Sequence, residues 1–485
     1  MTSPSFLKVS LRSTESSPIV EGESQRVFSD SPQSGSIENA VYSKWSWDGK
    51  SATLESDYSG FMPLFYFATS DCFIVSNSLA ALLEKGADTT LDETALSVFA
   101  RCGFFLGEST PFKSIKSIGP RGRVRWAGGK LDTSRGVDPI TPVKRASGEI
   151  AEEYAHFASK AIQRRLPDSE RFALLLTGGR DSRQILLELL DQDRKPQHCL
   201  TGGEYRDLVA ARQLAEHLDL PFEETKSPLY WRDAFPSKNL RSNFCTLEHG
   251  WLCAVSNRLS SLNCLAFDGT GVGVLTRSEL LASEYVADYR SGNYQSVALR
   301  LIHSIGGSKE LYKNLCPPFD FLGDSEEEAV AALAEELKAY SQFANPTTAF
   351  GFWNWNRRGI AQWPYALANR TNTINAPLMD EELYRFVASI EPESISEQEP
   401  QEAAIHHRFP QYQDLPFYNQ IENVASSRNK PLANRLANGW QRLRFSATHP
   451  KSRSKPPAHE TASQRNRVHH GNLDQYLQQL AKIVS

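Results

Sequence analysis

Hydrophobic residues follow two different spacings along the chain. Up to about residue 131, short runs in which apolar and polar positions alternate predict β-strands joined by tight turns. These strands are expected at 6–11, 52–56, 63–68, 72–77 and 124–126, with short helices at 79–83 and 93–102. The Ser-, Glu- and Pro-rich stretch 13–36 lacks such alternation and predicts a flexible, partly disordered loop.

The pattern changes after residues 139–143, which indicate a linker. Apolar strands then alternate with amphipathic helices, and from about residue 231 to 394 the periodicity is mostly helical. Strands are expected at 172–176, 197–201, 222–224 and 264–267, and helices at 147–165 and 207–218. This alternation predicts an α/β fold with a parallel sheet, helices on both of its faces, and ligands at the carboxyl ends of its strands.

The clearest chemical signal is the turn between the strand at 172–176 and the helix that follows it. Its sequence is Thr177-Gly-Gly-Arg-Asp181-Ser182. Backbone N–H groups and the positive end of a helix dipole stabilise an anion at such a junction, and glycines let the backbone approach a phosphate closely. Asp181 is suited to hold Mg²⁺ against a polyphosphate. Taken alone, such a turn is more typical of an ordinary strand–turn–helix corner, so the interpretation depends on its surroundings.

Its surroundings extend the signal. The turn resembles the pyrophosphate loop Ser-Gly-Gly-x-Asp-Ser of the asparagine synthetase family, with Thr177 in place of the first Ser. The helix from Asp207 to Leu218 and the Gly-x-Gly at 269–271 match further family motifs in the same order. Over residues 145–430 the resemblance implies a parallel-sheet ATP-pyrophosphatase domain, related to adenine nucleotide α-hydrolases, with a helical extension. It implies ATP and Mg²⁺ as cofactors.

The resemblance also implies roles for individual residues. The ATP and pyrophosphate site would comprise Leu176, Thr177, Gly178, Gly179, Asp181, Ser182, Thr201, Asp268, Gly269 and Gly271. Asp181 and Asp268 would bind the metal, while Asp181, Arg408 and His249 would serve catalysis and Arg357 and Arg358 would reach the substrate. For Arg408 and the two adjacent arginines, the sequence is equally consistent with surface or packing roles, and for His249 it favours a role as a satisfied interior residue.

Two positions depart from the family pattern. Gly273 stands where family members carry a metal-binding Asp, and residues 401–410 lack the family's phosphate-neutralising Lys. Arg408 is the cation expected to replace that Lys. A catalytically impaired protein that binds nucleotide as a scaffold or partner is therefore the alternative to an enzyme.

The first 140 residues resemble the glutaminase half of asparagine synthetases, through the turn at 57–60 and the segment 75–83. This implies an αββα fold of the N-terminal-nucleophile hydrolase class. Thr2 stands in place of the nucleophilic Cys, so the glutaminase is expected to be inactive. A lost Cys beside a retained ATP site resembles β-lactam synthetases and lasso-peptide cyclases. The implied function is an AMP-forming amide ligase of specialised biosynthesis, joining small-molecule or peptide carboxylates to amines.

Composition adds limits on location and partners. The 485 residues carry a net charge of −4, no stretch of 18 apolar residues, and seven cysteines without a C-x-x-C pair. These features predict a cytoplasmic protein with no membrane partner and no zinc. The last part of the chain, 431–485, reads as a basic flexible tail with a helix at 472–484. Nucleic acid is an unlikely partner, with tRNA-thiolation chemistry as the weakest alternative, and a homodimer or a biosynthetic partner protein stays open.

Overall fold

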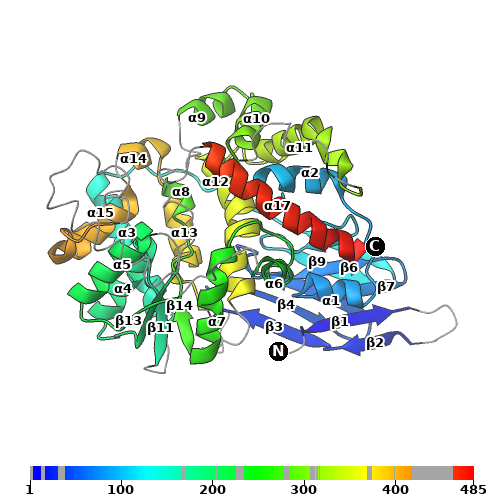
Figure 1. Cartoon of the computed structure of the whole chain (residues 1–485), viewed down its shortest axis with the longest axis horizontal. Helices are drawn as coiled ribbons and strands as arrows, with labels where there is room; N and C mark the ends of the chain where they lie inside the picture. The colour runs from blue at the N-terminus through cyan, green and yellow to red at the C-terminus, as the bar shows by residue number, and fades with distance from the viewer. Residues whose placement is uncertain are drawn as a thin grey trace.

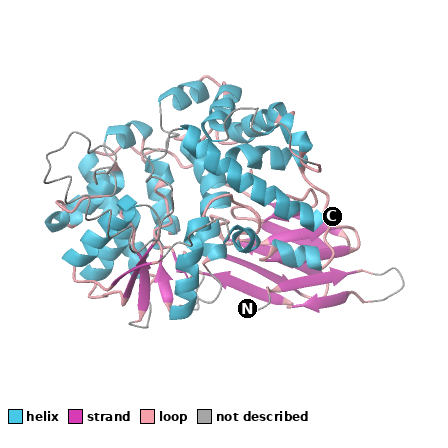
Figure 2. Ribbon diagram, in the orientation of Figure 1, coloured by secondary structure: helices cyan, strands magenta, loops and turns pink. Residues whose placement is uncertain are grey.

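The computed structural model of the chain contains three sheets and a large helical layer (Figures 1 and 2). It describes residues 4–11, 17–30, 39–166, 171–202, 205–225, 234–277, 283–305, 312, 315, 317–368, 374–397, 399–417 and 462–484. The fold is mixed α/β, with two antiparallel sheets in the N-terminal part and one parallel sheet in the C-terminal part.

Each antiparallel sheet has five strands. The first has the order β2-β1-β7-β6-β8 and the second β10-β9-β5-β4-β3. Their bounds are β1 Phe6–Ser10, β2 Ile19–Gly22, β3 Gln25–Ser29, β4 Tyr42–Trp47, β5 Ser51–Ser56, β6 Phe65–Ala68, β7 Cys72–Ser76, β8 Ile115–Ser117, β9 Arg123–Ala127 and β10 Lys130–Ser134. The hairpin predicted at 63–77 is confirmed as the antiparallel pair β6 and β7.

Part of the stretch 13–36 is ordered as sheet, so the predicted loop is wrong there. Strand β2 pairs with β1, and β3 pairs with β4. Both are edge strands, and most of their side chains are partly or fully exposed. An edge strand is stabilised by backbone pairing with one neighbour, so it shows little of the apolar alternation by which strands are recognised in sequence.

The two antiparallel sheets face each other across an apolar layer. Leu7, Val9, Phe73 and Val75 of the first sheet belong to the same buried cluster as Trp45, Leu54 and Trp126 of the second. Alternate residues of each strand point inward, as the period of two predicts. Helices α1 (Leu79–Glu84) and α2 (Glu93–Cys102) belong to a separate cluster on the other face of the first sheet, with Phe65, Phe67 and Ile74.

The outer face of the second sheet differs from the predicted αββα arrangement. Lys44 and Glu55 form an ion pair of 2.8 Å across β4 and β5, and both side chains are more than a third exposed. Arg123 and Arg125 of β9 are exposed on this face. Such charged positions face water, so within the described residues the N-terminal part has three layers, αββ, rather than four.

The C-terminal part is built on a parallel sheet of order β13-β12-β11-β14-β15. Its strands are β11 Phe172–Leu175, β12 His198–Thr201, β13 Phe222–Glu224, β14 Leu265–Phe267 and β15 Ile374–Asn375. Phe172 and Leu174 pack on one side with helices α4 (Arg180–Asp191) and α5 (Tyr205–His217). Ala173 and Leu175 pack on the other side with α7 (Cys253–Leu262). The predicted parallel sheet with helices on both faces is thereby confirmed.

The remaining helices have the following bounds. They are α3 Ser147–Gln163, α6 Phe235–Arg241, η2 Gly250–Leu252, α8 Val274–Arg277, α9 Ser283–Arg290, α10 Tyr294–Ile305, η5 Asp320–Gly323, α11 Glu326–Lys338, α12 Pro346–Gly351, η8 Pro377–Met379, α13 Glu381–Ala388, α14 Pro392–Glu397, α15 Pro400–Arg408, η9 Pro410–Tyr412 and α17 Ala462–Val484. Two π-helical segments follow α12, namely η6 Phe352–Ile360 and η7 Trp363–Leu367.

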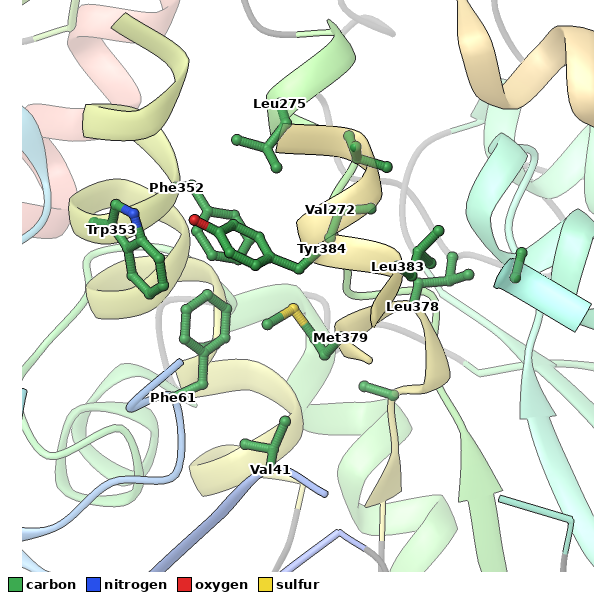
Figure 3. Packing of buried hydrophobic residues seen from close by; sticks show 14 of the residues in the cluster. Val41, Phe61, Val272, Leu275, Phe352, Trp353, Leu378, Met379, Leu383 and Tyr384 are labelled. Carbon is green, nitrogen blue, oxygen red and sulfur yellow. The ribbon is translucent and has the colours of Figure 1, made fainter. Parts of the chain in front are cut away.

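A shared apolar core joins the N-terminal and C-terminal parts. Figure 3 shows Val41 and Phe61 of the N-terminal part in one cluster with Phe352 of η6, Met379 of η8 and Tyr384 of α13. The rings of Phe61 and Phe352 are 5.2 Å apart between centroids. The Tyr58 hydroxyl also donates a hydrogen bond to the Met379 carbonyl. The two parts therefore bury apolar surface against each other.

The C-terminal helix docks on the body of the protein. Helix α17 is longer than the predicted 472–484, and Leu473, Tyr476, Leu477 and Leu480 are buried against Phe99 of α2 and Phe244. The basic segment expected before it, 431–461, lies outside the described residues. Among the described helices, none is both long and apolar enough to span a bilayer.

Candidate functional site

The candidate site lies where the order of the parallel sheet reverses. From the central strand β11 the chain proceeds to β12 and β13 on one side, and then returns to β14 and β15 on the other. The loops after β11 and β14 therefore leave the sheet next to each other and diverge. In open α/β sheets, ligands bind outside the carboxyl ends of the strands at such a point.

The loop after β11 is closed by its own hydroxyl groups. The Ser182 hydroxyl accepts a hydrogen bond of 3.1 Å from the Thr177 amide and lies 3.2 Å from the Thr177 hydroxyl. The Gly179 amide donates to the Thr177 Oγ1 at 3.1 Å. The side chains of Thr177 and Ser182 thus fix the conformation of the loop, and α4 begins directly after it at the edge of the sheet.

Helix α4 begins at this loop without a side-chain cap. Its N-cap residue is Gly179, which has no side chain to accept a hydrogen bond from the first turn. Gly178 is buried, whereas Thr177, Gly179 and Asp181 are partly exposed. An uncapped helix start presents backbone N–H groups and a positive dipole end, which favour an anion.

The loop after β14 is seated on the start of α4. A Cβ added to Gly269 would lie 2.9 Å from the Asp181 Cβ and 3.1 Å from the Ser182 amide nitrogen. A Cβ on Gly271 would lie 2.3 Å from the Leu378 Cβ. Both glycines therefore permit approaches that a side chain would prevent. The Asn356 amide of η6 fixes this loop further by donating to the Gly271 carbonyl at 3.0 Å.

Asp268 is the buried carboxylate of the site. Its Oδ1 accepts from the Thr270 amide at 2.7 Å, and its Oδ2 accepts from the Trp363 indole at 2.8 Å. Burial raises the pKa of Asp268, and the charge of Asp181 acts in the same direction, while the hydrogen bonds from Thr270 and Trp363 oppose the shift. The two aspartates thus belong to one electrostatic cluster.

These two carboxylates fit a divalent cation shared with a polyphosphate. A bound Mg²⁺ would lower the repulsion between Asp181 and Asp268. Mg²⁺ is typically held by one or two carboxylates together with phosphates and water. The described residues contain no group of three or more His, Cys, Asp or Glu that could hold a metal ion.

The adjoining strand β12 supplies the rest of the edge. Leu176 is fully buried, and its amide donates to the Leu200 carbonyl at 2.9 Å. Thr201 is buried, and its hydroxyl oxygen has no hydrogen-bond partner among the described residues. A Cβ on Gly202 would lie 2.8 Å from the Thr225 hydroxyl. The structure therefore brings Leu176 and Thr201 to the same edge as the loop, as expected.

A cation at the loop escaped the sequence-based prediction. Arg180, the first residue of α4, donates from Nε to Oε2 of Glu402 at 2.6 Å and lies 3.7 Å from Glu399. Glu399 caps α15 and accepts from the Thr276 hydroxyl at 3.1 Å. One feature of the sequence could have indicated this role, because Arg180 lies within the loop motif. Its carboxylate partners could not be identified in this way, because they lie about 220 residues further along the chain.

Arg408 does not reach the loop, which corrects the role expected for it. Its guanidinium pairs with Glu188 at 2.9 Å and with Asp191 at 2.7 Å. Glu188 lies eight residues beyond the start of α4, a separation of roughly 12 Å along a helix. The buried Glu188 carboxylate needs a cation, and this requirement holds Arg408 at the far end of α4.

His249 is an interior residue rather than a catalytic one. It is buried, and its Nε2 lies 3.1 Å from the Gly359 carbonyl, to which the neutral ring donates. Burial lowers the pKa of His249 to about 4, against the opposing effect of that hydrogen bond. The imidazole is consequently neutral at physiological pH, with its ring nitrogen engaged by η6.

Arg357 and Arg358 point away from the site, which corrects their expected role in substrate binding. Arg357 donates to the carbonyls of Trp353, Ile118 and Gly107. Arg358 donates to the Ser117 hydroxyl at 2.8 Å and to the Ser109 carbonyl. Both side chains are 2% exposed, and they bind the N-terminal loops 107–118 to η6. Nor do they lie in solvent, as the packed-helix alternative predicted.

Thr2, the residue expected in place of a glutaminase nucleophile, lies outside the described residues. Gly273 immediately precedes α8, and its carbonyl accepts from the Thr276 amide. No carboxylate is therefore supplied at position 273, and the acids that the described structure places at the loops are Asp181, Asp268, Glu399 and Glu402.

Comparison with known proteins gives weak likenesses. No protein-family profile and no curated protein matches the chain. One similar structure, described as the allosteric regulatory enzyme of purine biosynthesis, is 12% identical over 39% of this chain and 33% of its own, with a TM-score of 0.14. Another, the glutamine phosphoribosylpyrophosphate amidotransferase of B. subtilis with ADP and GMP, is 10% identical over 48% and 43%, again with a TM-score of 0.14. The matches span less than half of either protein, and at this level they define neither the fold nor the activity.

Proposed function

We propose that this chain is an ATP-dependent, AMP-forming amide ligase related to asparagine synthetases. In this proposal ATP and Mg²⁺ bind at the carboxyl edge of the parallel sheet. A substrate carboxylate attacks the α-phosphate, pyrophosphate leaves, and an amine then displaces AMP to form an amide.

One observation carries the proposal. Two glycine-containing loops meet at the reversal point of the sheet, and they meet so closely that Gly269 leaves no room for a Cβ against Asp181. This contact places the uncapped start of α4 beside two acidic side chains. Backbone amides for phosphate and carboxylates for Mg²⁺ are the complement that a metal–nucleotide requires.

In this proposal, different residues of the site would bind the phosphates, the metal and the base of ATP. The first turn of α4 would bind phosphate oxygens, and Asp181 and Asp268 would hold Mg²⁺. Leu176 and the unpartnered hydroxyl of Thr201 would contact the base. The bound metal would neutralise charge that builds up on the departing pyrophosphate. Positioning and electrostatic stabilisation would supply the rate enhancement.

The test is pyrophosphate exchange into ATP, catalysed by the purified chain with Mg²⁺ and a panel of amino acids and peptide carboxylates. Adenylation is reversible, so the correct acid makes labelled pyrophosphate enter ATP before any amine is supplied. Asp181→Asn should abolish exchange, whereas Asp71→Asn, in an exposed turn of the N-terminal hairpin, should leave it unchanged. Lack of ATP–Mg²⁺ binding by the wild-type chain would refute the proposal.

A nucleotide-binding scaffold is the second candidate. Three observations favour it: Gly273 supplies no carboxylate, Arg408 is held at the far end of α4, and Arg180 is paired with glutamates. A scaffold would bind ATP–Mg²⁺ yet exchange no pyrophosphate with any acid. In that case Gly273→Asp, which restores the acid of the related synthetases, should create activity.

A further inference from the structure

Two ion pairs join the same two helices, α4 and α15, but at different distances from the candidate site. Arg180 at the start of α4 pairs with Glu402 in the first turn of α15. Arg408 at the end of α15 pairs with Glu188 and Asp191 near the end of α4. The Arg408 pairs already join the two helices, so the Arg180–Glu402 pair is not needed for that purpose and can serve another.

The position of Arg180 is unfavourable for its helix. A cation in the first turn opposes the positive end of the helix dipole, where acidic residues are preferred. The cost is offset by Glu402 and Glu399, which are themselves well placed at the start of α15. A residue that breaks a local rule at the edge of a site is a candidate for function.

The negative charge of the carboxylates and of a bound nucleotide would also favour a cation at this site. The carboxylates placed at the two loops are Asp181, Asp268, Glu399 and Glu402. Arg180 and the neighbouring Arg183 are guanidinium groups of this cluster, and Arg180 is the one that pairs with Glu402 and Glu399. A nucleotide triphosphate would add about four negative charges, of which Mg²⁺ neutralises two. Arg180 follows Gly179 directly, so its side chain starts from the turn that would receive the phosphates.

We propose that Arg180 is the phosphate-binding cation of this site and that Glu402 holds it until a nucleotide or pyrophosphate arrives. This inference rests on the proposed function. Polyphosphate oxygens replace the Glu402 carboxylate as acceptors of the guanidinium, whose planar fork suits phosphate as well as carboxylate. Glu402, whose side chain is 26% exposed, then turns to water.

The guanidinium has a support that persists through this exchange. Its central carbon lies 5.0 Å from the ring centroid of Phe417. The neighbouring Arg183 is also stacked there, at 3.9 Å, and donates to the carbonyls of Leu415 and Pro416. Phe417 is therefore held in place by Arg183, and a cation–π contact limits the positions that Arg180 can take.

The experiment measures binding of ATP–Mg²⁺ and of inorganic pyrophosphate to the full chain by calorimetry. Arg180→Gln should weaken both by roughly tenfold or more, the loss typical of a charge-assisted contact. Glu402→Gln should strengthen both severalfold, because Arg180 no longer has to leave a carboxylate. Asp191→Asn breaks the exposed pair between the same helices and should change neither affinity.

Arg180→Gln and Glu402→Gln should change the binding affinity in opposite directions, and this distinguishes phosphate binding by Arg180 from a purely structural role. If Arg180 only joins α4 to α15, both variants weaken binding together or neither changes it, and either result overturns the inference while ATP binding itself stands. Arg180→Lys keeps the charge, so its affinities for ATP–Mg²⁺ and pyrophosphate should lie between those of wild type and Arg180→Gln. This variant replaces Arg180→Gln in the test if Arg180→Gln does not fold. Absence of ATP–Mg²⁺ and pyrophosphate binding in the wild-type chain refutes the proposed function as well.

Discussion

The indole Nε1 of Trp363 donates a hydrogen bond of 2.8 Å to Oδ2 of Asp268. Trp363 begins the π-helical segment η7, and Asp268 directly follows β14. The bond connects the buried carboxylate of the candidate site to an element that also contacts the N-terminal part, because the hydroxyl of Tyr365 in η7 donates to Asp30 at 3.5 Å. π-Helical segments frequently occur at functional sites. Here η6 donates a hydrogen bond to the Gly271 carbonyl in the loop after β14, and η7 donates one to Asp268 in the same loop.

We expect Trp363→Phe to destabilise the protein and to alter metal-dependent binding. Loss of the buried donor costs about 1–3 kcal/mol of unfolding free energy. The bond lowers the pKa of Asp268, so its removal raises that pKa further, and ATP–Mg²⁺ binding should then require a higher pH. Denaturant titration and calorimetry at several pH values measure both effects. Trp355→Phe is the control, because its indole bond to Glu248 is 3.4 Å and exposed.

Gly269→Ala should abolish nucleotide binding. The new Cβ would lie 2.9 Å from the Asp181 Cβ, so the loop and the start of α4 must separate. Strain of this kind in a packed region costs about 1–3 kcal/mol. Gly148→Ala in helix α3 is the matched control: its Cβ meets open space, and the substitution should stabilise by up to about 1 kcal/mol. Equal ATP binding by the two variants would contradict the predicted contact.

Arg357→Met should destabilise the whole protein without acting on the candidate site. The side chain is buried, and its removal takes the guanidinium donor from the Gly107 carbonyl and leaves the Ile118 carbonyl with only a 3.4 Å hydrogen bond from the Ser117 hydroxyl. A loss of about 3 kcal/mol or more is expected, given one to three per buried unsatisfied group. Arg385→Met, which breaks an exposed pair with Glu381, should cost under about 1 kcal/mol. Per folded molecule, ATP affinity should match wild type in both variants.

Stability should fall as pH rises from about 4 to about 7. Burial raises the pKa of Asp57 from 3.8 to about 7, although the Ser59 hydroxyl and the amides of Ser59 and Gly60 oppose the shift. Between these values the folded chain retains a proton that the unfolded chain releases, so the free energy of unfolding decreases with pH. Asp57→Asn should flatten this slope in urea titrations across the window. Little slope should remain in that variant. Asp30, whose pKa burial raises to about 6, also lowers stability as pH rises, whereas His249, whose pKa burial lowers to about 4, has the opposite effect over the same window.

The local part of the candidate site was predictable from sequence because it is encoded locally. The strand, the Gly-Gly turn and the amphipathic helix occupy consecutive residues, and the structure shows β11, the closed loop and α4 in that order. The parallel sheet followed from the alternation of strands and helices. Strand β13 was predicted at its observed bounds, Phe222–Glu224, even though it has three residues.

The partners of the long cationic side chains were not predictable. Arg408, Arg357 and Arg358 occur in sequence beside groups typical of binding sites, yet their acceptors lie roughly 200 to 250 residues away. Whether a guanidinium meets a ligand or a backbone carbonyl depends on tertiary packing, which periodicity does not contain. The Arg180–Glu402 pair was missed for the same reason.

The contacts of Arg357 and Arg358 with the loops 107–118 limit how this chain can be taken apart or recombined. A C-terminal fragment expressed alone would lack the N-terminal carbonyl and hydroxyl acceptors of both guanidinium groups and the loops that cover them, and Arg357 would keep only its bond to the Trp353 carbonyl. Chimeras that exchange the first 140 residues with those of a relative should therefore fail unless the donor supplies equivalent acceptors. The N-terminal part thus supplies the acceptors around which this stretch of the C-terminal part packs, whatever chemistry either part performs.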